Sequence, residues 1–162
     1  MYNFKISTYF KIIFFISLIS IISAYFIEYI LGYQPCRLCL IERIPYGLSM
    51  ILILLSYIFK RKEKFIIILL VLIFGFSVIL SFYHFGIEEG FFDESLVCGL
   101  KNASEILSKD EILKQLQTKT VSCKDVTFRI FGFSLTTLNM ALNLILTVFL
   151  TKIFKNYEKF KK

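Results

Sequence analysis

The residues of this chain best suited to chemistry are four cysteines, and they lie in its most polar stretches. Cys36 and Cys39 form a C-x-x-C motif where a long apolar run begins, and Cys98 and Cys123 lie in the one extended polar segment. Because 57% of the residues are hydrophobic, a purely structural cysteine would be expected inside the apolar runs. Accessible thiols are the ones that react, so we interpret both pairs as sites of thiol chemistry.

The C-x-x-C pair has three possible roles: a redox-active dithiol, a static disulfide, or half of a metal site. Its spacing lowers the pKa of one thiol, which favours redox exchange. A four-cysteine zinc site would normally add a second C-x-x-C in a compact polar domain, and Cys98 lies far from Cys123 in the sequence. We expect a redox role and no metal, with a structural bridge as the alternative. Four cysteines allow three pairings, and counting does not choose among them.

These cysteines must be positioned by membrane-spanning helices. The mean hydropathy is +0.72, and four apolar stretches reach the roughly 20 residues that a helix needs to cross a bilayer: 12–31, 40–59, 65–87 and 130–151. Solid apolar runs favour helices over barrel strands. A signal peptide is the alternative for the first run, but no small-residue cleavage site follows it. We predict one all-α membrane domain over 1–162, a four-transmembrane-helix bundle with outer loops at about 32–39 and 88–129.

Charge predicts the orientation of this bundle. The N-terminal segment, the basic turn at 60–64 and the C-terminal tail together carry a net charge of +9, whereas the loop 88–129 carries −2. By the positive-inside rule both termini are cytoplasmic and both cysteine pairs face the periplasm. Disulfides form and persist in that oxidising compartment. The overall charge of +7 is explained by this topology, so we expect no nucleic-acid partner.

A helix that starts at Pro35 would bring Cys36 and Cys39 close to Arg43. Proline is favoured in the first helical turn, and the three side chains would then share an arc of roughly 60°. Free backbone N–H groups and the guanidinium would stabilise a thiolate. Pro45 removes the hydrogen bond to Ile41, so a helix that began only there would lose this common face.

Two further residues at the predicted membrane boundary are candidates. Arg43 lies on the outer side, against the charge bias, and a fixed cation beside a thiol would explain that placement; interfacial snorkelling is the alternative. His84 is the single histidine, and simple interfacial packing is the alternative to a role for it. In the long loop, Asn102-x-x-Glu105 predicts the start of a short amphipathic helix on the membrane surface, with a plain loop as the alternative.

The electron acceptor is inferred by elimination. The chain has no Walker loop and no dinucleotide glycine fingerprint, and one histidine excludes a bis-histidine haem. If the thiols cycle, their electrons must leave through something that the membrane supplies. A lipid quinone accepts two electrons, which matches a dithiol.

Two segments resemble the DsbB family of disulfide bond formation proteins. Residues 35–43 read P-C-R-L-C-L-I-E-R, which is similar to the P-C-x-x-C-x-x-E-R of that family. Residues 83–88, Y-H-F-G-I-E, resemble the end of its third span, and the four spans with a cysteine pair in each outer loop extend the likeness over nearly the whole chain. The visible departure is Arg37 between the first two cysteines, which should favour a thiolate there.

The resemblance implies an inner-membrane quinone reductase that reoxidises a DsbA-type thioredoxin-fold protein of the periplasm. Cys98 and Cys123 would accept electrons from that partner, and Cys36 and Cys39 would pass them on. Arg43 would lie at the quinone, with His84 near it. Ubiquinone is the expected quinone, and menaquinone is the alternative. The remaining rivals are a related thiol oxidoreductase dedicated to another partner, the vitamin K epoxide reductase type included, and a channel or assembly subunit with structural disulfides.

The charge split makes a prediction about sidedness. After reduction of intact spheroplasts, a membrane-impermeant maleimide should label Cys98 and Cys123, because both are expected on the periplasmic side. Mass spectrometry of the labelled peptides gives the readout. Labelling that required disruption of the membrane would overturn the predicted orientation.

Overall fold

The predicted four-helix membrane bundle is confirmed by a computed structural model, which describes residues 2–58, 63–93, 98, 122–124, 129–130 and 132–157. Its elements are α1 (Tyr2–Tyr29), α2 (Arg37–Ile41), α3 (Ile44–Ile58), α4 (Glu63–Glu88), β1 (Arg129–Ile130), β2 (Phe133–Ser134) and α6 (Leu135–Lys155). Four stretches are long and apolar enough to cross a membrane: Ile6–Tyr29, Arg37–Ile58, Glu63–Glu88 and Leu135–Lys155. Among the described residues, then, the spans predicted from hydropathy are all present.

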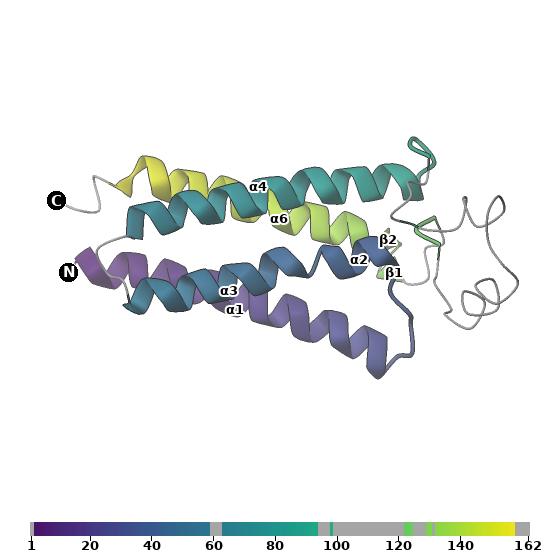
Figure 1. Ribbon diagram of the computed structural model, residues 1–162, viewed down its shortest axis with the longest axis horizontal. Coiled ribbons are helices and arrows are strands. Elements are labelled where there is room, and N and C mark those ends of the chain that lie inside the picture. Colours follow the sequence, from purple (N-terminus) through teal and green to yellow (C-terminus); the bar gives the residue numbers. More distant parts are fainter. Residues whose placement is uncertain are drawn as a thin grey trace, which may run out of the picture.

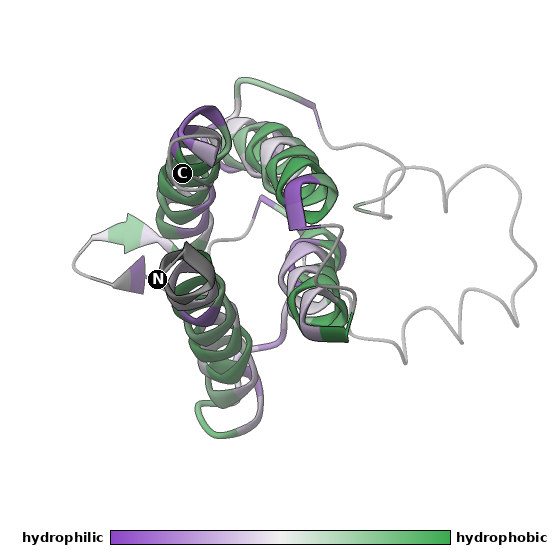
Figure 2. Cartoon of the chain, turned by 90° about the vertical axis from the view of Figure 1, so that its left-hand side faces the viewer, coloured by the Kyte–Doolittle hydropathy of each residue, from purple (hydrophilic) through white to green (hydrophobic). Residues whose placement is uncertain are grey.

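The helices run side by side, with both termini at one end of the bundle and α2 with the β-hairpin at the other (Figure 1). Helix α4 packs against α6 and α3, and α3 also packs against α1. The helices are hydrophobic along most of their lengths (Figure 2). Many large apolar side chains point outward, including Phe15, Leu72 and Ile145. Such a surface is suited to lipid, because the hydrocarbon core solvates apolar side chains.

Two separate clusters of buried residues form the interior. The larger lies toward the termini and is built from aliphatic and aromatic side chains such as Phe10, Ile67 and Phe74. The smaller lies at the opposite end and consists of three cysteines with two aliphatic residues: Cys36, Leu38, Ile87, Cys98 and Cys123. The bundle therefore has an ordinary apolar core at one end and a sulfur-rich core at the other.

The ends of the first and fourth spans differ from the prediction. The first was expected at 12–31, but the spanning helix covers Ile6–Tyr29; it ends early because Gly32, at φ 76°, takes the left-handed conformation that stops a helix. The fourth was expected from 130, but residues 129–134 hold an antiparallel hairpin. Helix α6 starts only at Leu135, where the Ser134 hydroxyl accepts a hydrogen bond from the Thr137 N–H.

The second span is divided into two helices. A helix start at Pro35 was expected, but α2 begins at Arg37, and Cys36 is its N-cap. The helix is interrupted at residues 42–43 before α3 resumes at Ile44, next to Pro45, whose missing N–H cannot continue the hydrogen-bond ladder. Cys36, Cys39 and Arg43 are therefore not carried by one continuous helix. The amphipathic helix expected near residues 102–115 lies outside the described residues.

Helix α4 ends in a close contact that connects it to the outer segment. The N–H groups of Phe91 and Phe92 both donate to the Gly86 carbonyl. A Cβ atom on Gly86 would lie 2.1 Å from the Phe92 ring, well inside van der Waals contact. Any larger residue at this position would therefore have to displace the Phe92 ring.

We expect Gly86→Ala to destabilise the protein by about 1–3 kcal/mol, the usual cost of overpacking. Gly75→Ala in the same helix is the matched control, because a Cβ there meets nothing within 4 Å and alanine is the better helix former. Thermal unfolding in detergent, followed by circular dichroism, compares the two. Equal unfolding temperatures for both variants would contradict the packing argument.

Candidate functional site

Five of the six residues predicted for the site line one cavity of about 310 Å³: Cys36, Cys39, Arg43, His84 and Cys123. The walls come from α1, from the second span, from α4 and α6, and from residues 122–123. The sixth, Cys98, does not line the cavity but is disulfide-bonded to Cys123, with 5.7 Å between their Cα atoms. The fold therefore gathers residues from four helices and the outer loop at one end of the bundle.

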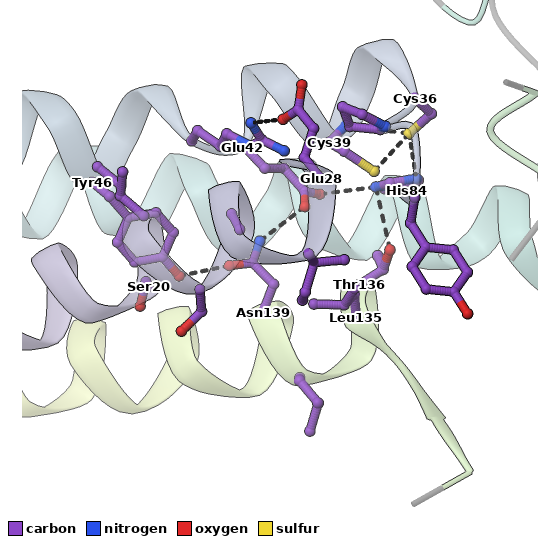
Figure 3. Close-up of a pocket in the computed structure, with 18 of the residues that line it drawn as sticks. Ser20, Glu28, Cys36, Cys39, Glu42, Tyr46, His84, Leu135, Thr136 and Asn139 are labelled. Carbon is purple, nitrogen blue, oxygen red and sulfur yellow. Dashed lines mark hydrogen bonds and ion pairs between the residues drawn. The ribbon is translucent and has the colours of Figure 1, made fainter. Parts of the chain in front are cut away.

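The C-x-x-C pair is a free dithiol held at the start of α2. The Sγ atoms of Cys36 and Cys39 lie 2.7 Å apart, and neither forms a disulfide. Because Cys36 is the N-cap, its sulfur accepts a hydrogen bond from the Cys39 N–H at 3.3 Å. Figure 3 shows the two sulfur atoms directed toward each other and toward His84. Little movement is needed to join them, since a disulfide requires an S–S separation of about 2.05 Å.

His84 connects this dithiol to a buried carboxylate. Its Nε2 lies 3.4 Å from Cys36 Sγ, and its Nδ1 lies 3.2 Å from Glu42 Oε1. His84 is 1% exposed and Glu42 is 6% exposed, so both are shielded from solvent. A thiol beside an imidazole that is oriented by a third group is the arrangement that activates cysteine nucleophiles. This arrangement joins α4 to the turn that follows α2.

The surroundings of Cys36 stabilise its thiolate form. A hydrogen bond from the Cys39 side chain, together with the hydrogen bond and charge of His84, lowers the pKa of Cys36 from 9.0 to about 5, although burial opposes this change. These contacts therefore favour the thiolate form of Cys36. Thiolates, and not thiols, are the reactive form in disulfide exchange.

Glu42 is also held by α6. Its Oε2 accepts a hydrogen bond from Asn139 Nδ2 at 2.9 Å. The Asn139 Oδ1 accepts one from the Tyr46 hydroxyl at 2.6 Å, and Asn139 Nδ2 donates to Ser81 as well. Tyr46 of α3 and Ser81 of α4 thus hold the Asn139 amide, and the amide holds the Glu42 carboxylate, so the network fixes the position of His84 indirectly. Figure 3 shows the part of this network that runs from Tyr46 through Asn139 to Glu42.

A second carboxylate, the half-buried Glu88, lies at the end of α4. It accepts hydrogen bonds from the hydroxyls of Ser134 and Thr136, each at 2.6 Å, and its Oε1 is 3.9 Å from His84 Nε2. The Ser134 hydroxyl also caps α6. This contact therefore fixes the start of α6 against the end of α4, beside the dithiol.

Arg43 lies on the cavity wall but is held by α1. Its Nη1 donates to Glu28 Oε2 at 2.5 Å, and the guanidinium carbon is 4.9 Å from the centre of the Tyr25 ring. The close partner of the cysteine sulfurs in this structure is His84, on α4. The expected interaction of Arg43 with Cys39 stays a prediction.

Sequence reasoning did not assign roles to Glu28, Glu42, Glu88 and Asn139. A signal was present, because charged residues inside spans are rare and usually functional, and Glu28 is the one charge in the apolar run 12–31. Glu42 directly precedes Arg43, within the motif already singled out. Asn139 gave no comparable signal, since a lone amide in a span is common at helix contacts.

Comparisons with known proteins agree with this architecture. The model of the family described as disulfide bond formation protein DsbB matches residues 7–153. The uncharacterized protein RP370 of Rickettsia prowazekii (strain Madrid E) is 34% identical over 137 residues, covering 83% of this chain and 80% of that protein. No solved structure matches significantly. Since the family match includes all four cysteines and reaches into all four spans, the chain belongs to the DsbB family of membrane disulfide bond formation proteins.

Proposed function

We propose that this protein is an inner-membrane thiol:quinone oxidoreductase that reoxidises a DsbA-type thioredoxin-fold protein of the periplasm. The observation that carries the proposal is the packing of a Cys98–Cys123 disulfide and a free Cys36–Cys39 dithiol in one buried cluster. A protein with purely structural disulfides has no need for a free dithiol beside a buried histidine and carboxylate. Family membership supports the thiol chemistry. The quinone as electron acceptor and the DsbA-type protein as electron donor are proposed in addition.

The outer disulfide is proposed to react first. A partner thiolate attacks Cys98, which forms a mixed disulfide and releases Cys123 as a thiolate. The second partner thiol then attacks this mixed disulfide, so that the partner leaves oxidised and Cys98 and Cys123 hold two electrons. Cys98 is 1% exposed and Cys123 is 2% exposed, so the reaction requires a local movement that uncovers the pair.

The electrons are then passed to the inner pair. Cys123 lines the same cavity as Cys36 and Cys39, which favours it over Cys98 as the attacking thiolate. Its attack on the Cys36–Cys39 disulfide forms a mixed disulfide, and Cys98 resolves that intermediate, so that the outer pair is oxidised again and the inner pair is reduced. The Cys98–Cys123 disulfide beside the free thiols of Cys36 and Cys39 supports this direction of transfer.

His84 and Glu42 are proposed to move and hold the proton of this dithiol. With Nε2 at 3.4 Å from the sulfur, the imidazole takes the proton from Cys36. Glu42, at Nδ1, orients the ring and stabilises its charged form, as the third member of a nucleophile–base arrangement does. The dithiol is thereby prepared to give up two electrons and two protons and to close to a disulfide.

The cavity fits a quinone. Its volume of about 310 Å³ is in the range of sites for small organic ligands. Apolar side chains from α1 and α6, such as Ile27, Leu138 and Leu142, form much of the wall. Arg43 supplies N–H donors for a carbonyl oxygen, and Glu28 fixes its position. When bound there, a quinone (ubiquinone, or menaquinone as the alternative) supplies a two-electron, two-proton acceptor.

The relay is tested by removing either inner thiol. In Cys36→Ser and Cys39→Ser variants, steady-state turnover should be abolished, because no second disulfide can form to pass electrons onward. The Cys98–Cys123 disulfide should still be reduced once by a reduced DsbA-type partner. Quinone absorbance follows turnover, and acid quenching with alkylating mass tags follows the outer pair. Multiple turnovers in either variant would refute the relay.

Arg43 is tested by a neutral replacement. Arg43→Gln should raise the apparent KM for quinone about tenfold or more, since a hydrogen bond from a charged donor is lost, and should leave reduction of Cys98–Cys123 by the partner nearly unchanged. Arg43→Lys should rescue only partly, because an ammonium lacks the planar donor fork of a guanidinium.

Two controls accompany the Arg43 variants. Arg37→Gln removes the same charge from an exposed position next to Cys36 that does not line the cavity, and it should leave quinone kinetics unchanged. Glu28→Gln combined with Arg43→Gln separates loss of the cation from the effect of an unpaired Glu28. If Arg43→Gln slowed partner exchange and spared quinone kinetics, its assignment to the quinone would be wrong.

A further inference from the structure

We propose that the reduced protein holds a second kind of ligand at the dithiol: a thiophilic d¹⁰ cation such as Zn²⁺, bound by Cys36, Cys39 and His84. No metal was expected from the sequence, because the four cysteines do not have the spacing of a zinc site. The structure adds the third donor, since it brings the histidine of α4 to the two thiols of α2. The proposed site does not depend on quinone chemistry.

The geometry of the three donors is suited to this cation. The two Sγ atoms and a nitrogen of His84 all lie within 4.8 Å of one another. Donor atoms on a tetrahedral zinc, at the usual Zn–S and Zn–N bond lengths, are separated by about 3.5–3.8 Å. The Cys36 Sγ to His84 Nε2 distance is already 3.4 Å. The two sulfurs, 2.7 Å apart, need only a modest outward rotation of Cys39.

The histidine is prepared to act as a ligand. Its Nδ1 faces Glu42 Oε1 at 3.2 Å, so a proton on Nδ1 can be held by the carboxylate while Nε2, which faces the Cys36 sulfur, gives up its proton to bind the cation. A carboxylate behind a histidine is the usual outer support of a zinc-binding imidazole. Glu42 is itself held by Asn139, so the ring does not have to be reoriented when the cation binds.

Access and coordination number also fit. Cys39 is partly exposed, and it lines the cavity with Cys36 and His84, so an ion has a path to the three donors. Three protein ligands leave a fourth position for water, as in open zinc sites. Glu88 Oε1 lies 3.9 Å from Nε2, the nitrogen that would bind the cation, and its negative charge favours a cation there.

The site would exist in only one redox state. Zn²⁺ replaces the remaining thiol protons and binds both sulfurs as thiolates, whereas the Cys36–Cys39 disulfide offers no thiolate. The cation therefore binds the reduced inner pair and prevents its closure to a disulfide. If the proposed function is correct, Zn²⁺ inhibits turnover by holding the protein in its reduced state.

The experiment uses Co²⁺ as a spectroscopic substitute for Zn²⁺. The purified full-length protein in detergent is first reduced, and the reductant is then removed under anaerobic conditions. Thiolate-to-cobalt charge-transfer bands and tetrahedral d–d bands should appear with one Co²⁺ per chain, and Zn²⁺ should abolish them. The same titration is repeated with the Cys36–Cys39 pair oxidised, which should not bind the metal. It is also made on a variant with Cys98 and Cys123 both changed to Ala, in which only the inner thiols contribute.

Matched variants separate a built site from adventitious binding. Cys36→Ser should abolish the charge-transfer bands, and His84→Gln should weaken binding strongly, while Glu42→Gln should weaken it about 10–100-fold, as loss of an outer-shell carboxylate does. Arg129→Gln, at an exposed position that does not line the cavity, should bind as the unchanged protein does. Circular dichroism reports whether each variant is folded. If a ligand variant fails to fold, Glu42→Gln still tests the site, because it keeps all three ligands.

Three outcomes would overturn the site: equal binding by the oxidised protein, unchanged binding by a folded Cys36→Ser or His84→Gln variant, or the absence of a thiolate charge-transfer band in the reduced protein. Its failure is distinguishable from failure of the proposed function. If the reduced protein binds Co²⁺ but shows no quinone-dependent turnover, the metal site stands and the proposed function is refuted. If turnover is normal but no Co²⁺ binds, the proposed function stands and the metal site is refuted.

Discussion

The contact between the Cys36 thiol and the His84 imidazole is the interaction that the outer half of the bundle is built to hold. It joins groups 48 positions apart in the chain, on different spans, in a region shielded from water. Burying charged and polar groups in such a region costs free energy unless the groups are paired. The neighbouring hydrogen bonds supply that pairing: Glu42 holds the far nitrogen of the ring, and Asn139 holds Glu42.

This network also explains how the bundle keeps a defined arrangement at its outer end. Lipid tails solvate the apolar side chains of spanning helices as well as another helix does. Specific packing and interhelical hydrogen bonds therefore decide how the helices associate. Asn139 binds residues of α3 and α4 as well as Glu42, and Glu88 binds the start of α6. The same hydrogen bonds therefore position the reactive thiol and join the helices around it.

The sequence predicted the elements well and the contacts between them less well. Four helices follow from hydropathy because a lipid-exposed backbone must satisfy its own hydrogen bonds, and the model has them. The break at residues 42–43 was visible as a possibility in Pro45. The hairpin before α6 was missed, because residues 130–134 are apolar enough to continue a span and only Gly132, at φ 87°, and the Ser134 cap mark the boundary.

Within the site, the C-x-x-C and its position at a helix start could be predicted because capping and spacing are local properties. The side chain that approaches the thiol could not. Helical periodicity favoured Arg43, four residues from Cys39, whereas the fold brings in His84 from another span and pairs Arg43 with Glu28 of α1. Which residue meets a cysteine across the bundle depends on how the helices pack, and a single sequence does not specify that packing.

The pairing of Glu28 with Arg43 has a consequence for how the chain enters the membrane. The two residues lie near those ends of the first two spans that are next to the dithiol. If these ends face the periplasm, as the charge distribution predicts, each residue must cross the bilayer during insertion. An isolated ionised side chain in the hydrocarbon region costs several kcal/mol (about 2.5–3.5 by insertion measurements). A hairpin of α1 with α2 and α3 carries both charges through as a neutral pair. Co-insertion of the first two spans, and not stepwise entry, is therefore the route that the finished structure favours.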